Sequence, residues 1–208
     1  MTALPTTPSP RTFAITWDYR CPYARNAHEH VVAGLLAGAP WDVTFVPFNL
    51  DQTHLEDGET PVWDEPDRYP GLLATAAGLV VRDQFPEQFL PAHAALFAAR
   101  HDRSLDLRRR PVLAEVLDQC EVDGAAVLAA IDDGWPLQTF RKLHESAVAD
   151  YDVFGVPTFI AGGRAVFVRL LSRPGDDTDL AISTVQRVVD LTTGWDDLNE
   201  FKQTVVPR

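Results

Sequence analysis

The sequence predicts a mixed α/β domain with one sheet, interrupted by a long all-helical segment. Three observations predict it. Apolar and polar residues alternate near both ends of the chain, the middle has helical periodicity, and the order is β-α-β, then helices, then β-β-α. The chain has 208 residues, of which 46% are hydrophobic and 23% are charged. A chain of this size and composition can bury a core without disulfides or a structural metal.

The first fifty residues predict a β-α-β unit. Residues 12–17 alternate polar and apolar β-formers and predict a strand, and residues 42–48 predict a second strand. Residues 21–38 between them carry alanine, valine and leucine on one helical face, and Gly38 and Pro40 end that helix. A crossover of this length allows the two strands to pair in parallel.

The rest of the chain predicts helices followed by a hairpin and a last helix. Residues 49–69 form a polar loop, and the chain is helical from residue 70 to about residue 151. Within it, helical spacing occurs at 92–101, 111–120, 125–131 and 137–150. Strands are expected at 158–160 and 165–170, with a helix at 178–193. We expect a flexible lead-in at 1–11 and one domain at 12–208, with a helical insertion at about 68–145.

Charge and cysteine content exclude several classes of function. The formal net charge is −12, which argues against nucleic acid or an anionic membrane as a partner. The N-terminal residues lack the basic start and apolar stretch of a secretory signal, so we expect a cytoplasmic protein. Cys21 and Cys120 are the only cysteines, too few for a disulfide framework or a four-cysteine zinc site. No metal site is expected.

Two short motifs lie where a sheet of this topology meets its helices. Residues 17–24, WDYRCPYA, run from a strand end into a helix, so Cys21 faces unpaired backbone N–H groups at the helix start. Pro22 suits the first helical turn because its missing N–H is not needed there. Residues 154–159, FGVPTF, enter a later strand through Val156 and Pro157.

With these motifs, the chain resembles the DsbA-like branch of the thioredoxin superfamily over roughly residues 12–193. The matching pieces are CPYA at residues 21–24, where the family has CPxC, GVPTF at 155–159, and ALFAA at 95–99 followed by Asp106-Leu107. The resemblance implies a thioredoxin-like fold. It also implies that Cys21 is the reactive cysteine, that Pro157 is cis and lies against it, and that the backbone of Val156 binds a thiol or peptide.

The departure from the family lies at Ala24, which occupies the position of the second, resolving cysteine. A dithiol enzyme completes its reaction by closing an internal disulfide, which this motif cannot do. A site with one cysteine can still exchange a mixed disulfide with a small thiol. We therefore expect no permanently bound cofactor, and glutathione or mycothiol as co-substrate. The partner would be a small-molecule or protein disulfide, and a homodimer is left open.

Other residues near the motif are candidates for substrate contact. Trp17, Tyr19, Tyr23 and Trp63 could form an aromatic rim over a flat substrate, with core packing as the alternative. Together with Pro22, Val156 and Pro157, Tyr23 and Trp63 are the predicted binding residues. His28, two turns beyond Cys21, is expected on the surface or in packing, and Cys120 as a half-buried apolar residue.

Three functions remain open. The first is a cytoplasmic thiol-disulfide oxidoreductase that acts through Cys21 with a small thiol. The second is a thiol-dependent isomerase, transferase or nitroreductase acting on a small aromatic molecule, because the resemblance includes hydroxychromene carboxylate isomerases. The third is a non-catalytic binding module.

We also expect no disulfide between the two cysteines. The helix start, Arg20 and Arg25 predict a pKa for Cys21 below the ~8.5 of a free thiol.

Overall fold

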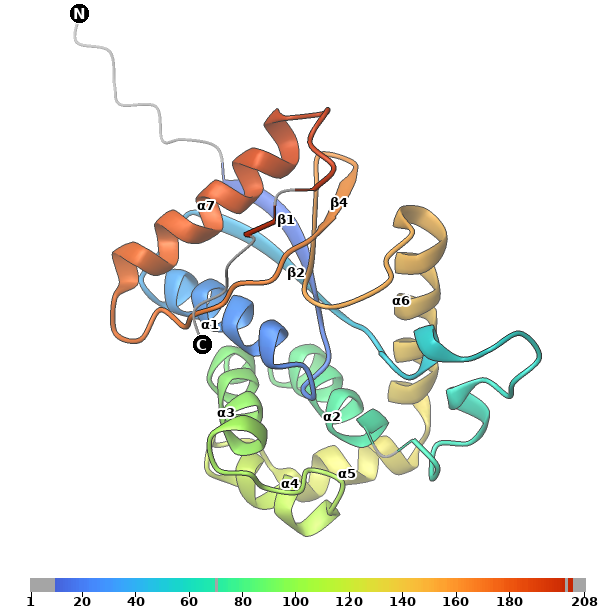
Figure 1. Cartoon of the computed structure of the whole chain (residues 1–208). Coiled ribbons are helices and arrows are strands. Elements are labelled where there is room, and N and C mark those ends of the chain that lie inside the picture. The colour runs from blue at the N-terminus through green and yellow to red at the C-terminus, as the bar shows by residue number, and fades with distance from the viewer. Residues whose placement is uncertain (1–9, 70, 201, 204–208) are drawn as a thin grey trace, which may run out of the picture.

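A four-stranded mixed sheet forms the centre of the molecule, and helices surround it (Figure 1). The computed structural model describes residues 10–69, 71–200 and 202–203. The strands are β1 (Arg11–Trp17), β2 (Trp41–Pro47), β3 (Thr158–Ala161) and β4 (Arg164–Phe167). The helices are α1 (Pro22–Leu36), α2 (Gly71–Gln84), α3 (Phe89–His101), α4 (Arg110–Asp118), α5 (Gly124–Asp132), α6 (Trp135–Tyr151) and α7 (Thr178–Gly194).

The strand order β2-β1-β3-β4 is that of a thioredoxin-like sheet and confirms the predicted fold class. β1 and β2 pair in parallel along their whole length, so α1 forms the crossover between them. β3 runs antiparallel to β1, with Phe159 opposite Ile15, and β4 turns back beside β3. Gly162 and Gly163 in that turn have φ values of 58° and 77°, which glycine adopts without a side-chain clash.

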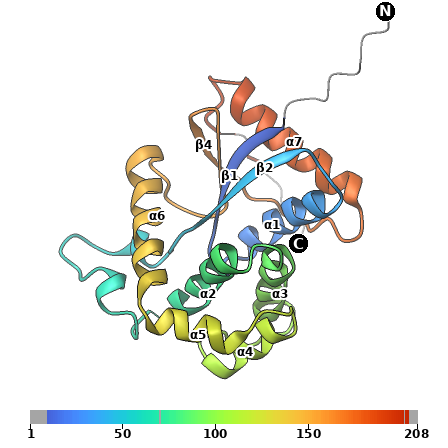
Figure 2. The ribbon, with the colours of Figure 1, turned by 180° about the vertical axis from the view of Figure 1, so that it is seen from behind.

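Helices α2 to α6 occupy the chain between β2 and β3, and no strand lies there among the residues that the structure describes. α2 to α5 group together at one end of the sheet, whereas α7 packs on α1 and on the β3–β4 hairpin (Figures 1 and 2). The loop at 49–69 is not structureless, because it holds 3-10 turns at Gln52–His54 and Val62–Asp64. β4 ends at Phe167, earlier than predicted. Residues 1–9 of the predicted lead-in lie outside the described residues, and Arg11 already pairs in β1.

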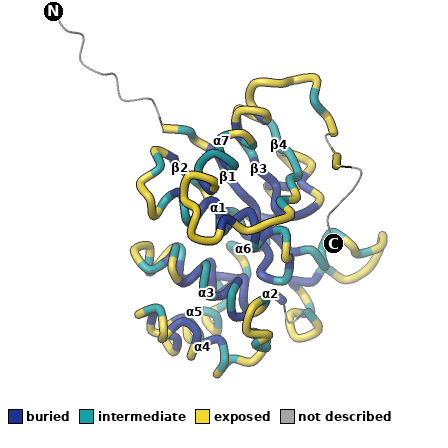
Figure 3. Tube along the Cα trace, turned by 60° about the vertical axis from the view of Figure 1, so that its left-hand side comes forward, coloured by how far each residue is buried: buried dark blue, intermediate teal, exposed yellow. Residues whose placement is uncertain are grey.

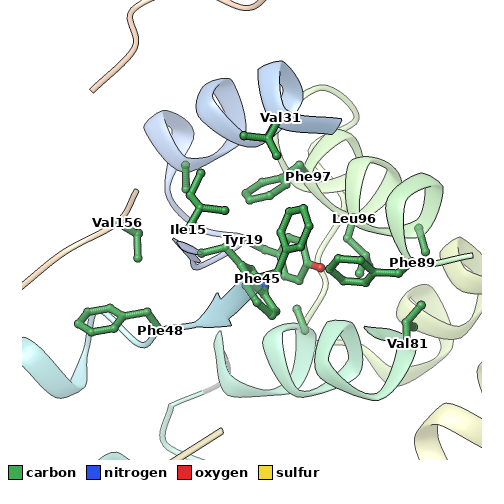
Figure 4. Packing of buried hydrophobic residues seen from close by; sticks show 14 of the residues in the cluster. Ile15, Tyr19, Val31, Phe45, Phe48, Val81, Phe89, Leu96, Phe97 and Val156 are labelled. Carbon is green, nitrogen blue, oxygen red and sulfur yellow. The ribbon is translucent and has the colours of Figure 1, made fainter. Parts of the chain in front are cut away.

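One hydrophobic core joins the sheet to the helical segment. Most of β1 and β3 and the inner faces of α1 and α3 are buried, β4 is half-buried, and exposure is confined mostly to loops and outer helix faces (Figure 3). Figure 4 shows Phe89 and Phe97 of α3 packed toward Phe45 and Tyr19. α2 approaches the end of β1 so closely that a Cβ atom at Gly78 would overlap the Tyr19 hydroxyl. The helical segment therefore supports the turn that leads to Cys21.

Candidate active site

Cys21 is the N-cap residue of α1, at the end of the turn that follows β1. Its backbone N–H donates to the Asp18 carbonyl at 3.0 Å, which sets the turn. Its Sγ atom accepts the backbone N–H of Ala24 at 3.4 Å and donates to the Val156 carbonyl at 3.3 Å. Pro22 occupies the first helical turn, as the sequence predicted. The thiol thus lies between the start of α1 and the segment that enters β3.

That segment carries the second motif, and the Val156–Pro157 peptide bond is cis, the isomer that the resemblance implies. The carbonyl that faces Cys21 is the oxygen of this bond. Thr16 of β1 ties the segment to the sheet, since its hydroxyl accepts the N–H of Thr158 at 2.9 Å and donates to the Gly155 carbonyl at 3.4 Å. The structure therefore brings Cys21 and the Val156–Pro157 bond together.

The expected fall in the pKa of Cys21 is wrong. The residue is 9% exposed, and burial raises the pKa of its thiol because a thiolate there loses hydration. Asp18 raises it further. The N–H groups of Ala24 and Tyr23 and the positive charge of Arg169 act in the opposite direction, but the first effect outweighs them. The helix start stabilises a thiolate less than desolvation penalises it.

The two arginines expected to help the thiolate are paired with carboxylates instead. Arg20 holds buried Asp18 in a two-point ion pair, with its Nη2 atom 2.8 Å from Oδ2, and also reaches Asp51 at 2.7 Å. Arg25 pairs with Asp102 at 2.7 Å. The sequence placed both near Cys21, but the directions of their side chains are decided by these partners.

The predicted aromatic rim does not form. Trp17 and Tyr19 are 0% and 1% exposed and belong to the core. Trp63 is buried too, in a second cluster with Phe140, separate from the cluster that contains Cys21. The ring centroids of Trp63 and Phe140 are 5.0 Å apart in an edge-to-face contact. Tyr23 alone of the four is half-buried at the site. Core packing, the alternative to a rim, explains the other three.

Arg169, which the sequence analysis did not single out, lies over the Tyr23 ring. Its guanidinium carbon is 5.6 Å from the centroid of Tyr23 and 5.5 Å from that of Phe167. These distances are those of cation–π contacts. Arg169 follows β4, so no sequence spacing connects it with a residue on α1. Its contact with Tyr23 places a cation beside the thiol.

His28 belongs to a buried hydrogen-bonded chain that joins β1, α1 and α3. Its Nε2 atom is 3.1 Å from the Thr16 carbonyl, and its Nδ1 atom is 2.9 Å from Nε2 of His93. Nδ1 of His93 is 2.7 Å from the Tyr19 hydroxyl. Because a carbonyl only accepts, both rings can be satisfied in their neutral forms when each Nε2 donates and Tyr19 donates to His93. Burial lowers the pKa of His28 to about 4 and that of His93 well below its usual value.

A separate groove is lined by neither Cys21 nor the Val156–Pro157 bond. It is a cavity of about 510 Å³ between the 49–69 loop, the end of α6 and Phe154. Trp63 and His144 line it, and Nδ1 of His144 accepts the backbone N–H of Asn49 at 3.3 Å. Trp63, although largely buried, thus contributes to the lining of this groove, which reaches Phe154 but includes neither Val156 nor Pro157.

Both cysteines are free, which confirms the prediction of no disulfide. Cys120 is half-buried after the end of α4, as expected of an apolar residue. Within the described ranges, no group of three His, Cys, Asp or Glu side chains could hold a metal ion. None of the described helices is both long and apolar enough to cross a bilayer.

The sheet topology, the thiol at the start of α1 and the cis-proline against it are those of a thioredoxin-like protein. Residues 73–171 match the family described as DSBA-like thioredoxin domain, a segment that contains the cis-proline but not Cys21. This confirms the DsbA-like resemblance stated from the motifs. No curated protein sequence matches the chain.

Solved structures with this fold include oxidoreductases and an isomerase. Reduced DsbA1 from Neisseria meningitidis has a TM-score of 0.58 and 16% identity, with 92% of this chain and 90% of that chain covered. MdbA, a thiol-disulfide oxidoreductase from Actinomyces oris, has a TM-score of 0.56 and 22% identity over 83% and 80%. A 2-hydroxychromene-2-carboxylate isomerase has a TM-score of 0.60 and 12% identity over 86% and 96%. At these identities the likeness shows the fold alone.

Proposed function

We propose that the protein is a thiol-disulfide oxidoreductase that works through the single thiol of Cys21 with a small thiol from solution. The observation that carries this proposal is the contact of 3.3 Å between Sγ of Cys21 and the oxygen of the cis Val156–Pro157 bond. This contact puts the one thiol of the motif beside backbone that can form hydrogen bonds with a bound thiol or peptide. The N–H of Ala24 stabilises the thiolate when it forms.

The reaction consists of two exchanges. The Cys21 thiolate attacks one sulfur of a disulfide, a Cys21–sulfur bond forms, the substrate S–S bond breaks, and the other half leaves as a thiolate that takes up a proton. The thiolate of a small thiol then attacks the substrate sulfur of the mixed disulfide. Cys21 leaves as a thiolate, and the small thiol and the substrate are released joined by a disulfide. Two electrons pass at each exchange, and the enzyme ends unchanged.

The second exchange needs an external thiol because the motif holds no second cysteine and Cys120 is not bonded to Cys21. Ala24 lacks a sulfur, and Cys120 is half-buried beyond α4. Glutathione and mycothiol are the co-substrates that fit this role, with a small-molecule or protein disulfide as substrate. A cytoplasmic location, where such thiols are kept reduced, suits the cycle.

Mass spectrometry tests the proposal. The protein is treated with glutathione disulfide, denatured under non-reducing conditions and digested. We expect one glutathione adduct on Cys21 in the wild type and in Cys120→Ser, none in Cys21→Ser, and release of the adduct by added glutathione. An adduct on Cys120 alone would contradict the proposal. The absence of any adduct would favour a non-catalytic binding module.

The groove supports a second candidate, a thiol-dependent isomerase, transferase or nitroreductase of a small aromatic molecule. Its volume of about 510 Å³ lies within the range of small-molecule sites, and Trp63 and Phe154 offer it aromatic rings. An isomerase leaves the amount of free small thiol unchanged, whereas the oxidoreductase joins one small thiol to half of its substrate in a mixed disulfide at each turnover. Measuring the isomerised product and this mixed disulfide in the same sample separates these two activities.

A further inference from the structure

Arg169 differs from the other arginines around the Cys21 motif because it has no carboxylate partner among the described residues. Arg20 pairs with Asp18 and Asp51. Arg25 and Arg173 share Asp102, and Arg173 also binds Glu29. Arg169 is exposed, and no carboxylate in the described part of the chain lies within ion-pair distance of it. In a protein with a net charge of −12, its positive charge is left for another partner.

Two aromatic rings hold this arginine in place. Tyr23 lies on the first turn of α1, two positions after Cys21, and Phe167 is the last residue of β4. Phe167 pairs in the sheet with Thr158, which follows Pro157. One ring thus comes from the helix that begins after Cys21, and the other from the strand that pairs with β3. A guanidinium in a cation–π contact still has N–H groups for hydrogen bonds, and its planar geometry matches a carboxylate.

We infer that Arg169, held on Tyr23 and Phe167, is an anion subsite that binds a carboxylate of the small thiol or disulfide that exchanges with Cys21. This inference rests on the proposed function, because it assigns the charge of the molecule that meets the thiol. The charge of Arg169 also acts on Cys21 itself, where it opposes the rise in the pKa of the thiol. The contact of Arg169 with Tyr23 places this cation against the turn of α1 that begins at Cys21.

The subsite distinguishes between the two co-substrates. Glutathione carries a net negative charge at neutral pH and would gain from Arg169, whereas mycothiol has no carboxylate and would gain nothing. The overall negative charge of the protein repels anions at a distance, so the preference must come from contact at the site. The structure thus favours a carboxylate-bearing thiol such as glutathione.

The test compares two disulfides that react with Cys21 in the Cys120→Ser protein. Dithiobis-nitrobenzoate carries a carboxylate on each half, and dithiodipyridine is uncharged. Both meet the same fraction of thiolate, so the ratio of their second-order rate constants cancels any change in the pKa of Cys21. Arg169→Met keeps an apolar stem on the rings and removes the charge, and Arg169→Lys keeps the charge. Arg187→Met, at an exposed position on α7, changes the net charge equally and is the control.

We expect Arg169→Met to lower the ratio of charged to uncharged reagent about three- to tenfold, the size of a partly exposed charge contact. Arg169→Lys should retain most of the ratio, and Arg187→Met should leave it unchanged. A ratio unaffected by Arg169→Met, or lowered equally by Arg187→Met, would overturn the subsite while leaving Cys21 as the reactive thiol. If neither reagent modifies Cys21, the proposed function fails and the subsite fails with it.

Discussion

The Sγ atom of Cys21 lies 3.3 Å from the carbonyl oxygen of Val156, although 135 positions separate the two residues in the chain. A protonated thiol can donate a hydrogen bond to this oxygen, but a thiolate cannot. The contact therefore favours the neutral form, as burial does, and the Ala24 N–H favours the charged form. If a bound disulfide displaced the thiol hydrogen from the Val156 carbonyl, this contact would no longer favour the neutral form of Cys21.

The pH dependence of alkylation should show this balance. In Cys120→Ser, we expect the rate of Cys21 modification by iodoacetamide to rise with pH around a midpoint above the ~8.5 of a free thiol, because burial raises its pKa. Only a small part of Cys21 is then thiolate at pH 7. The rate is measured by mass spectrometry at several pH values, with Cys21→Ser as the blank. A midpoint below about 8.5 would contradict the role of burial.

The close approach of α2 to the end of β1 predicts a cost for any side chain at Gly78. A Cβ atom there overlaps the Tyr19 hydroxyl, which is held in the core by His93. We expect Gly78→Ala to lower the free energy of unfolding by about 1–3 kcal/mol, as overpacking does in a closed core. Urea denaturation measures this.

Gly194→Ala is the matched control for that substitution. A Cβ atom at Gly194, the last residue of α7, meets no atom within 4 Å. The change should stay within about 0.5 kcal/mol of the wild type. Equal stability of both variants would show that α2 can shift away from Tyr19.

The buried chain from Tyr19 to Thr16 predicts a specific penalty for Tyr19→Phe. The substitution leaves Nδ1 of His93 without its donor in a site closed to water, which costs about 1–3 kcal/mol. Tyr151→Phe removes a hydroxyl from a side chain that is 38% exposed, and should cost almost nothing. Thermal and urea unfolding of the two variants give the comparison, and similar losses would mean that the hydrogen bond contributes little.

The buried histidines predict acid lability. The pKa values of His28 and His144 are lowered by burial to about 4, against ~6.5 in the unfolded chain. Between those values the unfolded state binds more protons, so stability falls as the pH decreases. Each histidine contributes a slope of about 1 kcal/mol per pH unit in that window. Urea unfolding at pH 7, 6 and 5 measures the slope.

His144→Gln keeps an acceptor for the N–H of Asn49 and removes one of these titrations. The pH slope of its unfolding free energy should therefore be shallower than that of the wild type. Parallel slopes in the wild type and in His144→Gln would show that His144 takes up no proton on unfolding.

Local sequence patterns carried most of the fold. Alternation defined β1 and β2 to within a residue, and the 3.6-residue spacing located α1 and α3 to α7 within a few residues at each end. These patterns predict secondary structure because a strand or helix usually buries one face, and the residues on that face recur at short, regular spacing in the sequence. The Cys21-Pro22 and Gly155–Pro157 sequences also predicted element boundaries, since the first marks the start of a helix and the second the entry into a strand.

Contacts between segments that are far apart in the sequence became apparent only in the tertiary structure. His93 contacts His28, which lies 65 positions earlier in the chain, and the guanidinium of Arg169 lies over the Tyr23 ring. No spacing in the sequence predicts either contact. The pKa of Cys21 was misjudged for the same reason, because desolvation depends on every element packed around the thiol and not on its own helix alone. Local patterns were enough to predict the fold class and the position of the thiol. The partners and exposure of the side chains near that thiol depend on how α3, the segment that enters β3 and the residues after β4 pack around α1.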